Sequence, residues 1–198
     1  ALTGGIDLLT VKPMAFLLGG LTVLMSLVSG AVYGLSLILL YTVSSVYHGL
    51  IPSLGKKVMQ VIDHCTIYTL IAGTYTPVLL CALRPSYPRL AWTLLAAEWG
   101  TAAVATVFSA IDHKKFHAVE MTAYLVMGWL CVAAYRPVVE CLSREGFTWL
   151  LAGGVAYTIG AVLYGLGSKK NPIFHTVFHV FVDIGSILHA VCVLCYVL

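Results

Sequence analysis

Long apolar runs, separated by short clusters of polar residues, glycines and prolines, dominate this chain. Six runs of spanning length fall at about residues 30–51, 60–82, 90–110, 118–136, 147–167 and 173–198. A helix needs ~20 apolar residues to cross the hydrocarbon core of a bilayer, and each run supplies about that number. The runs exceed the usual length of a strand, and the later ones lack regular period-2 alternation, so the pattern favours helices.

A weaker apolar segment at 14–28 lies upstream of these six runs. It is short for a span, and extending it toward the N-terminus takes in Asp7 and Lys12. We therefore expect an all-α membrane protein, a seven-transmembrane-helix bundle whose first helix is incomplete or poorly defined. No linker, charge block or internal repeat divides the chain, so residues 1–198 are expected to form a single domain.

The composition excludes a water-soluble domain. Hydrophobic residues make up 60% of the chain and charged residues 10%, and the mean hydropathy is +0.96. A soluble domain of this composition would expose most of its apolar surface. The net charge of +3 is mild and the basic residues occur in scattered pairs, so no nucleic-acid partner is expected. The six cysteines lie mostly in apolar runs, where a thiol packs as a small hydrophobe.

The basic residues of the loops predict an orientation. On one side the loops carry six lysines, namely Lys56, Lys57, Lys114, Lys115, Lys169 and Lys170. The loops of the other side carry four arginines, partly offset by Glu140 and Glu145. Positive residues favour the cytoplasmic side. With seven helices, this bias places the N-terminus in the cytoplasm and the C-terminus outside.

Three histidines and one aspartate fall at helix ends that share one membrane depth. His48 closes the second helix, Asp63 opens the third, and His175 and His179 open the last. The two histidines of the last helix are one turn apart on the same face, about 6 Å along the axis. Each histidine alone could be an interfacial side chain with its polar tip in water. Together, three imidazoles and a carboxylate have the make-up of a catalytic zinc site with an open fourth position.

Two further side chains are candidates for the same site. Asp63 is the candidate general base, which would orient a water and carry its proton to the leaving amine. Ser44, one turn deeper than His48, could donate to the substrate carbonyl, or its hydroxyl could be satisfied by the backbone carbonyl four residues back. Asp183 lies one turn deeper than His179. It could accept a hydrogen bond from a ligand imidazole, or be protonated and bonded to a neighbouring helix.

The remaining ionisable residues of the helices are expected to have structural roles. His189 lies too far along the last helix to share an ion with the others, which favours packing. For His64, His113 and His117, structural or solvated roles suffice. Glu98 lies in the middle of the fourth span and is expected to face the bundle and be paired, because an isolated charge is costly there.

These residues lie in motifs that resemble the hemolysin III branch of the superfamily that contains the progestin and adiponectin receptors. The motifs are an S-x-x-x-H at 44–48, an aspartate followed by A-G-T-Y-T-P within 63–77, and an H-x-x-x-H at 175–179. The segments M-G-W at 127–129 and G-G-V-A-Y at 153–157 look like the fifth and sixth helices of that family. The resemblance covers about residues 30–198.

The resemblance implies a fold, a cofactor and a class of substrate. It implies a seven-helix bundle in the bacterial cytoplasmic membrane, with Zn²⁺ held near the cytoplasmic face by His48, His175 and His179. Asp63 and Ser44 would belong to the same site. In the broader superfamily, which includes alkaline ceramidases, such a site is proposed to hydrolyse amide bonds in lipids. A membrane lipid is therefore the expected substrate or ligand.

The leading hypothesis is a zinc-dependent hydrolase that acts on a lipid amide or ester. One alternative is a non-enzymatic receptor or stress-sensing membrane protein with structural zinc, and another is a hemolysin or pore-forming protein. A pore requires polar stripes along several helices, whereas here the polar residues cluster at one depth. An enzyme and a receptor would use the same residues, so both stay open from the sequence.

Overall fold

The computed structural model describes residues 8–112, 115–167 and 171–198, and these contain helices and short connections but no strand. His113, Lys114, Lys169 and Lys170 lie outside the described residues. The helical elements in chain order are α1 (Leu8–Gly49), α2 (Leu54–Pro77), the π-helix η1 (Val78–Leu83), α3 (Pro88–Asp112), α4 (His117–Gly128), α5 (Leu130–Ala133), α6 (Tyr135–Gly167) and α7 (Pro172–Tyr196).

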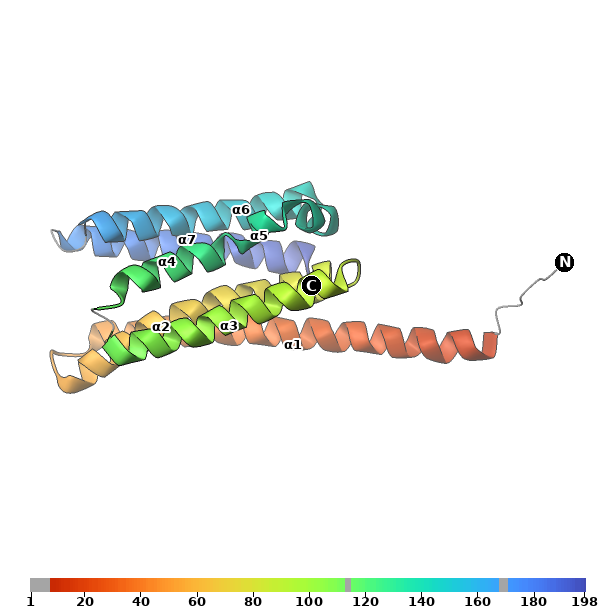
Figure 1. The fold of residues 1–198 in the computed structure, drawn as a ribbon, viewed down its shortest axis with the longest axis horizontal. Helices are drawn as coiled ribbons and strands as arrows, with labels where there is room; N and C mark the ends of the chain where they lie inside the picture. The colour runs from red at the N-terminus through yellow and green to blue at the C-terminus, as the bar shows by residue number, and fades with distance from the viewer. Residues whose placement is uncertain (1–7, 113–114, 168–170) are drawn as a thin grey trace.

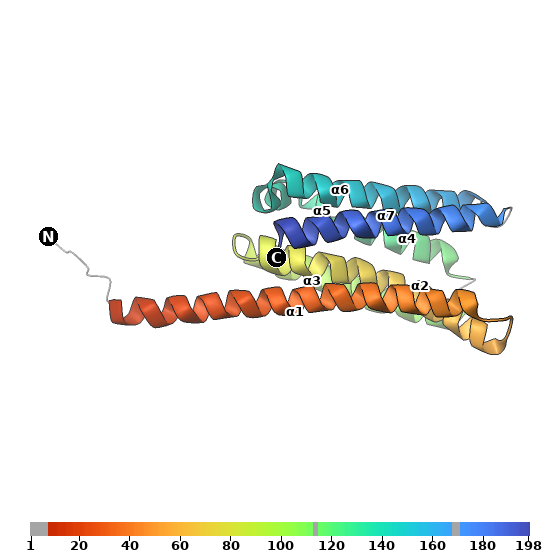
Figure 2. The ribbon, with the colours of Figure 1, turned by 180° about the vertical axis from the view of Figure 1, so that it is seen from behind.

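The helices lie alongside one another and alternate in direction. Figures 1 and 2 show that α1 ends, α2 begins, α6 ends and α7 begins at the same end of the bundle. We call this the histidine end, because it contains His48, His175 and His179; the opposite end is the distal end. The C-terminus lies at the distal end, and the N-terminal part of α1 extends beyond it.

Five helices of the described residues are long and apolar enough to cross a membrane. They are Gly19–Gly49, Leu54–Leu83, Pro88–Asp112, Tyr135–Gly167 and Ile173–Tyr196. Four of them contain the runs predicted at 60–82, 90–110, 147–167 and 173–198. The structure thus agrees with an all-α, multi-pass membrane protein, but it does not show seven separate spans.

The two helices predicted at 14–28 and 30–51 form one continuous helix instead. α1 has 42 residues, which at 1.5 Å per residue is about 63 Å, roughly twice the hydrocarbon thickness of a bilayer. Gly30 is the residue at the predicted break, and a single glycine costs only about 1 kcal/mol in a helix. Next to it, the Ser29 hydroxyl donates to the Met25 carbonyl at 2.6 Å, a bond compatible with an unbroken helix.

The predicted span at 118–136 is broken rather than continuous. α4 ends at Gly128, where Trp129 leaves the helical conformation with φ −100° and ψ 7°. The Tyr75 side chain of α2 crosses this break. Its hydroxyl donates to the Gly128 carbonyl at 2.8 Å and accepts from the Cys131 amide at 3.2 Å. Backbone groups that lose their helical hydrogen bonds inside a membrane need other partners, because no water is available there. The Tyr75 hydroxyl supplies such a partner and so stabilises the interrupted helix.

The loop predicted from Arg136 to Gly146 is largely helical. α6 already begins at Tyr135 and turns sharply at Ser143, the positive-φ residue of the described chain, with φ 67° and ψ 166°. The Ser143 hydroxyl accepts a hydrogen bond from the Gly146 amide at 3.3 Å and so caps the second part of α6. The chain therefore turns through a corner between two helical pieces at the distal end (Figure 1).

Close contacts at small residues fix the helices that carry the histidines. A Cβ atom on Gly153 of α6 would collide with the His189 ring of α7. On the other side of the bundle, a Cβ atom on Gly73 of α2 would lie 2.8 Å from the Ser36 Cβ of α1. Small residues let the backbones of membrane helices approach closely. These contacts hold α7 against α6 and α1 against α2, and thereby position the ends of α1 and α7.

Candidate metal centre

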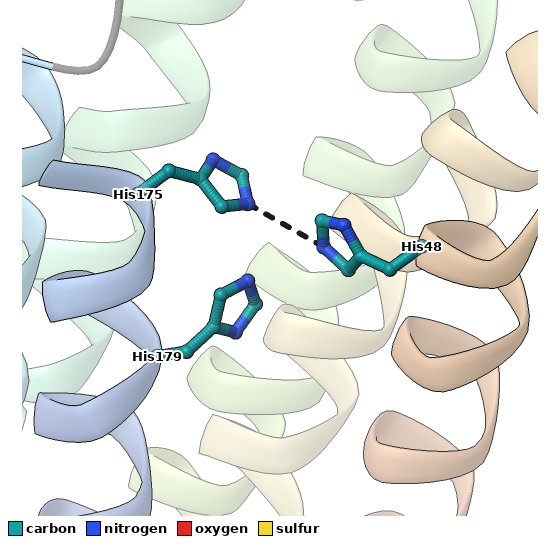
Figure 3. A group of neighbouring side chains, drawn as sticks. All are labelled: His48, His175 and His179. Atoms are coloured by element: carbon teal, nitrogen blue, oxygen red, sulfur yellow. Dashed lines mark hydrogen bonds between the residues drawn. The ribbon is translucent and has the colours of Figure 1, made fainter. Parts of the chain in front are cut away.

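Three histidine side chains meet at the histidine end of the bundle (Figure 3). His48 comes from the last turn of α1, and His175 and His179 come from the first turns of α7. The ring centroids are 5.0 Å apart for His48 and His175, 4.9 Å for His48 and His179, and 4.8 Å for His175 and His179. One nitrogen from each ring lies within 4.8 Å of the others.

The helix ends that carry the triad are fixed by local hydrogen bonds. Asn171 caps α7, with its side-chain oxygen accepting from the Ile173 amide at 3.0 Å, and Pro172 occupies the first helical turn. After α1, the Lys56 ammonium donates to the Leu50 carbonyl at 2.6 Å and so closes the short connection to α2. The triad therefore spans two well-defined helix ends rather than loops.

The arrangement of the three imidazoles fits a metal ion. The Nε2 atoms of His175 and His48 are 3.4 Å apart. Two nitrogens that bind one tetrahedral zinc ion at 2.0–2.1 Å lie about 3.3 Å apart, which is close to this distance. The Nε2 atom of His179 is buried and has no hydrogen-bond partner among the described residues. A buried nitrogen without a partner is costly in a membrane protein, and a metal bond would satisfy it.

Asp63 and Ser44 lie beside the triad. The Ser44 hydroxyl donates a hydrogen bond to the Asp63 carboxylate, and this carboxylate is close enough to His48 and His179 to interact with both electrostatically. Asp63 is half-buried in α2 and His48 is exposed. The structure therefore brings together the four side chains that the sequence placed at one membrane depth, and Ser44 lies beside them.

A cavity of about 160 Å³ extends from the triad into the bundle. Ser44, Asp63, His175 and His179 line it at the histidine end, and His189 lines it further down. The 14 residues from His175 to His189 correspond to roughly 21 Å along α7. The cavity walls are mostly apolar and include eight tyrosine, tryptophan and phenylalanine side chains. These are Tyr41, Tyr47, Tyr75, Tyr124, Trp129, Tyr157, Tyr164 and Phe178.

Asp183 lies one turn beyond His179 on α7. Its side chain is exposed and is close enough to Tyr41 of α1 and to His179 to interact with both electrostatically. The Tyr41 hydroxyl donates to Ser186 at 2.8 Å, and Tyr157 hydrogen bonds to the same serine at 2.8 Å. The Tyr41 proton is thus donated to Ser186, and both roles expected for Asp183 stay predictions.

His189 and Glu98 are both inside the bundle. The Nε2 atom of His189 lies 3.0 Å from the Leu150 carbonyl, and its ring packs 5.3 Å from that of Tyr157, in agreement with a packing role. Glu98 is only 1% exposed, as expected for a bundle-facing residue. Its two carboxylate oxygens have no hydrogen-bond partner among the described residues, so the expected pairing is not found.

Tyr164 is a site residue that the sequence did not reveal. Its ring centroid lies 5.4 Å from that of His175 and 5.1 Å from that of Phe178, so it packs beside the triad from α6. Aromatic residues are common near the ends of membrane helices, so its position in the sequence carries no specific signal. Its role becomes visible only once α6 lies against α7.

Comparisons with known proteins identify relatives of this chain. Residues 8–190 match the family model described as haemolysin-III related. The chain is 40% identical to Hemolysin-3 of Bacillus cereus over 173 residues, which cover 87% of this chain and 77% of that protein. It is 40% identical to the Hemolysin-3 homolog of Bacillus subtilis (strain 168) over 170 residues, with 86% and 78% covered.

A more distant relative is the human monocyte to macrophage differentiation factor, 30% identical over 166 residues that cover 80% of this chain and 66% of that protein. No solved structure matches the chain significantly. The relationship expected from the sequence motifs is thereby confirmed. The chain belongs to the haemolysin-III related family of multi-pass membrane proteins.

Proposed function

We propose that this protein is a zinc-dependent membrane hydrolase that cleaves an amide or ester bond in a lipid. The observation that carries the proposal is the position of the histidine triad, which lies with a carboxylate and a hydroxyl at one end of an apolar cavity. A deep apolar cavity that ends in a few convergent polar groups is typical of a binding or active site.

His48, His175 and His179 would hold the zinc ion through their ring nitrogens. A zinc ion in such a site supplies a water with a pKa near 7 and polarises a carbonyl group. Asp63 would accept a proton from the attacking water and deliver it to the leaving nitrogen or oxygen, as a general base and then a general acid. The single Ser44 proton would either hold the Asp63 carboxylate in place or be donated to the substrate carbonyl.

The cavity supports a lipid as the substrate. Its apolar wall runs for roughly 21 Å from His175 to His189, and aromatic rings form much of it. A lipid chain would lie along this wall with its carbonyl group beside Asp63 and the triad. Contacts along the lipid chain would hold its carbonyl group close to the reacting groups. This proximity would lower the activation barrier of the hydrolysis.

A hemolysin is the second candidate, since the name Hemolysin-3 of the Bacillus cereus relative favours it. A conducting pore requires polar side chains along several helices. In the part of the chain that the structure describes, the histidine triad, Asp63 and Ser44 instead gather at one end of the cavity. A receptor with structural zinc would keep the same triad without turnover, so an activity measurement separates it from an enzyme.

The test is hydrolysis by the purified full chain, reconstituted in lipid bilayers and loaded with zinc. Ceramides and lipid esters of several chain lengths are the substrates, and release of the free fatty acid is measured. We expect turnover by the wild type and none by His179→Ala, which lacks one of the three nitrogens. Absence of turnover by the zinc-loaded wild type across the whole panel would favour the receptor.

We further propose that the protein lies in the bacterial cytoplasmic membrane with the histidine end in the cytoplasm. Lys56, Lys57 and Lys115 lie at this end among the described residues, and positive residues favour the cytoplasmic side. A seventh span would form if residues 14–28 turned back into the bilayer. In the structure these residues belong to the continuous helix α1, whose length, about twice the hydrocarbon thickness, would be enough for two spans.

Cysteine labelling in intact cells tests the orientation after the native thiols are removed. Ile51 is 78% exposed at the histidine end, and Ser86 is exposed at the distal end. We expect a membrane-impermeant reagent to label Ser86→Cys and to leave Ile51→Cys unlabelled; the reverse pattern would invert the orientation. A cysteine added at the N-terminus should stay protected with seven spans and react if α1 crosses only once.

A further inference from the structure

The end of the cavity away from the triad contains a polar atom that the proposed reaction does not use. His189 of α7 lines this end, and its Nε2 atom lies 3.0 Å from the Leu150 carbonyl. Because a carbonyl only accepts hydrogen bonds, Nε2 must carry the ring proton. The neutral ring, which is the form that costs less inside a membrane, then has a lone pair on Nδ1. This Nδ1 atom is buried and has no hydrogen-bond partner among the described residues.

The packing of the His189 ring fixes the direction of Nδ1. A Cβ atom on Gly153 of α6 would collide first with the Cδ2 and Nε2 atoms of His189, so this edge of the ring lies against α6. Nδ1 and Cε1 form the opposite edge, which faces away from Gly153. A flip of the ring would replace Nε2 by Cε1 beside Leu150 and so break the bond to the carbonyl.

Neighbouring donors in the cavity wall are already used. The Tyr75 hydroxyl donates to the Gly128 carbonyl at 2.8 Å, and the Trp129 indole nitrogen donates to the Thr158 hydroxyl at 3.0 Å. A buried acceptor without a donor raises the free energy of the folded protein. A molecule that brings its own donor to the Nδ1 atom of His189 would therefore bind favourably here.

The space at this end has the size of one small polar group. A cavity of about 10 Å³ adjoins the main cavity and shares five wall residues with it. These are Tyr75, Gly128, Trp129, Gly154 and His189. A cavity of this size holds about one water molecule, so it can take a hydroxyl group but no further length of chain.

We propose that His189 and this small cavity form a hydroxyl subsite, which binds a hydroxyl group at the far end of a lipid acyl chain. The lipid hydroxyl donates its hydrogen bond to Nδ1. The inference rests on the proposed function for the orientation of the lipid, with its carbonyl group at the triad. The roughly 21 Å between His175 and His189 require a long chain. The substrate class is thus a long-chain lipid hydroxylated at the end of its acyl chain.

The experiment measures binding of free fatty acids, the expected products, to the zinc-loaded full chain in detergent by isothermal titration calorimetry. The two probes are palmitate hydroxylated at its terminal carbon and palmitate hydroxylated in mid-chain. They have the same composition and similar polarity, so they should partition similarly into the detergent. We expect the wild type to bind the terminal isomer about tenfold more tightly, the usual effect of one hydrogen bond.

His189→Gln removes the proposed acceptor and keeps the structural bond. Its side-chain amide can still donate to the Leu150 carbonyl, but it has no polar atom at the position of Nδ1. The preference for the terminal isomer should fall to about one. His189→Asn is the companion variant, because its amide lies near the position of Nδ1, and it should keep part of the preference. His117→Gln, which changes a histidine outside the cavity wall, should bind both isomers like the wild type.

Equal affinity of the wild type for the two isomers would overturn the hydroxyl subsite. So would a preference that persists unchanged in His189→Gln. Thermal unfolding shows whether this variant is folded; if it is not, the comparison of the two isomers on the wild type still decides. Since binding is measured without turnover, hydrolysis without a preference would overturn only the subsite. A preference without hydrolysis of any lipid would support the subsite and overturn the hydrolase.

Discussion

Replacing His48, His175 or His179 by alanine is expected to remove the zinc ion of the triad and to abolish hydrolysis. Each residue supplies one of the three nitrogens that lie within 4.8 Å of one another. With one imidazole gone, two protein ligands remain, fewer than the three that catalytic zinc sites use. Zinc content and fatty-acid release, measured on the same preparations, should therefore fall together, with a loss of one ion per chain.

Thr176→Ala is a matched control for these variants, since Thr176 lies between the two α7 histidines but is exposed. It should keep both the zinc and the activity. Full zinc retention in all three alanine variants would rule out the triad as a metal site.

Asp63→Asn is expected to keep zinc and the fold but to lower hydrolysis by ~10²–10⁴-fold, the usual contribution of a positioned acid–base group. The amide is nearly the same size as the carboxylate, so it can still accept a hydrogen bond from Ser44. It cannot accept and return a proton. Metal content and activity should thus separate in this variant, in contrast to the histidine variants.

The measurement combines zinc content, melting temperature and turnover of a ceramide on the same samples. Ser44→Ala is the companion variant, because it removes the hydroxyl that bonds Asp63 and leaves the carboxylate in place. We expect it to retain more activity than Asp63→Asn. Unchanged turnover in zinc-loaded Asp63→Asn would exclude Asp63 from the chemistry. Loss of zinc or of thermal stability in this variant would show a structural role instead.

Several features of the protein could be predicted from the sequence because they depend only on composition and on the direction in which successive helices cross the membrane. Long apolar runs must form helices in a bilayer, where backbone groups have no water to bond. Helices that cross in turn alternate in direction, so residues at successive helix ends fall at known depths. That reasoning placed His48, Asp63, His175 and His179 at one end of the bundle, where the structure has them.

The sequence did not determine where helices are interrupted. The expected break near Gly30 is absent, because one glycine is too weak to end an apolar helix. The break after Gly128 was not expected, because it depends on Tyr75 of another helix to satisfy the released backbone groups. The sharp turn at Ser143 likewise falls within a segment that was expected to be a loop.

The tertiary structure alone decided which side chains face each other around the helix axes. Asp183 continues the stripe of His175 and His179 in sequence, and only the packing of α1 on that side of α7 brings it near Tyr41. His117 was expected to be structural or solvated. It lies against Glu120, together with a histidine from α2, a structural role whose partners the sequence did not indicate. Sequence gives the depth of a residue in the membrane, but only the packing of neighbouring helices decides its partners.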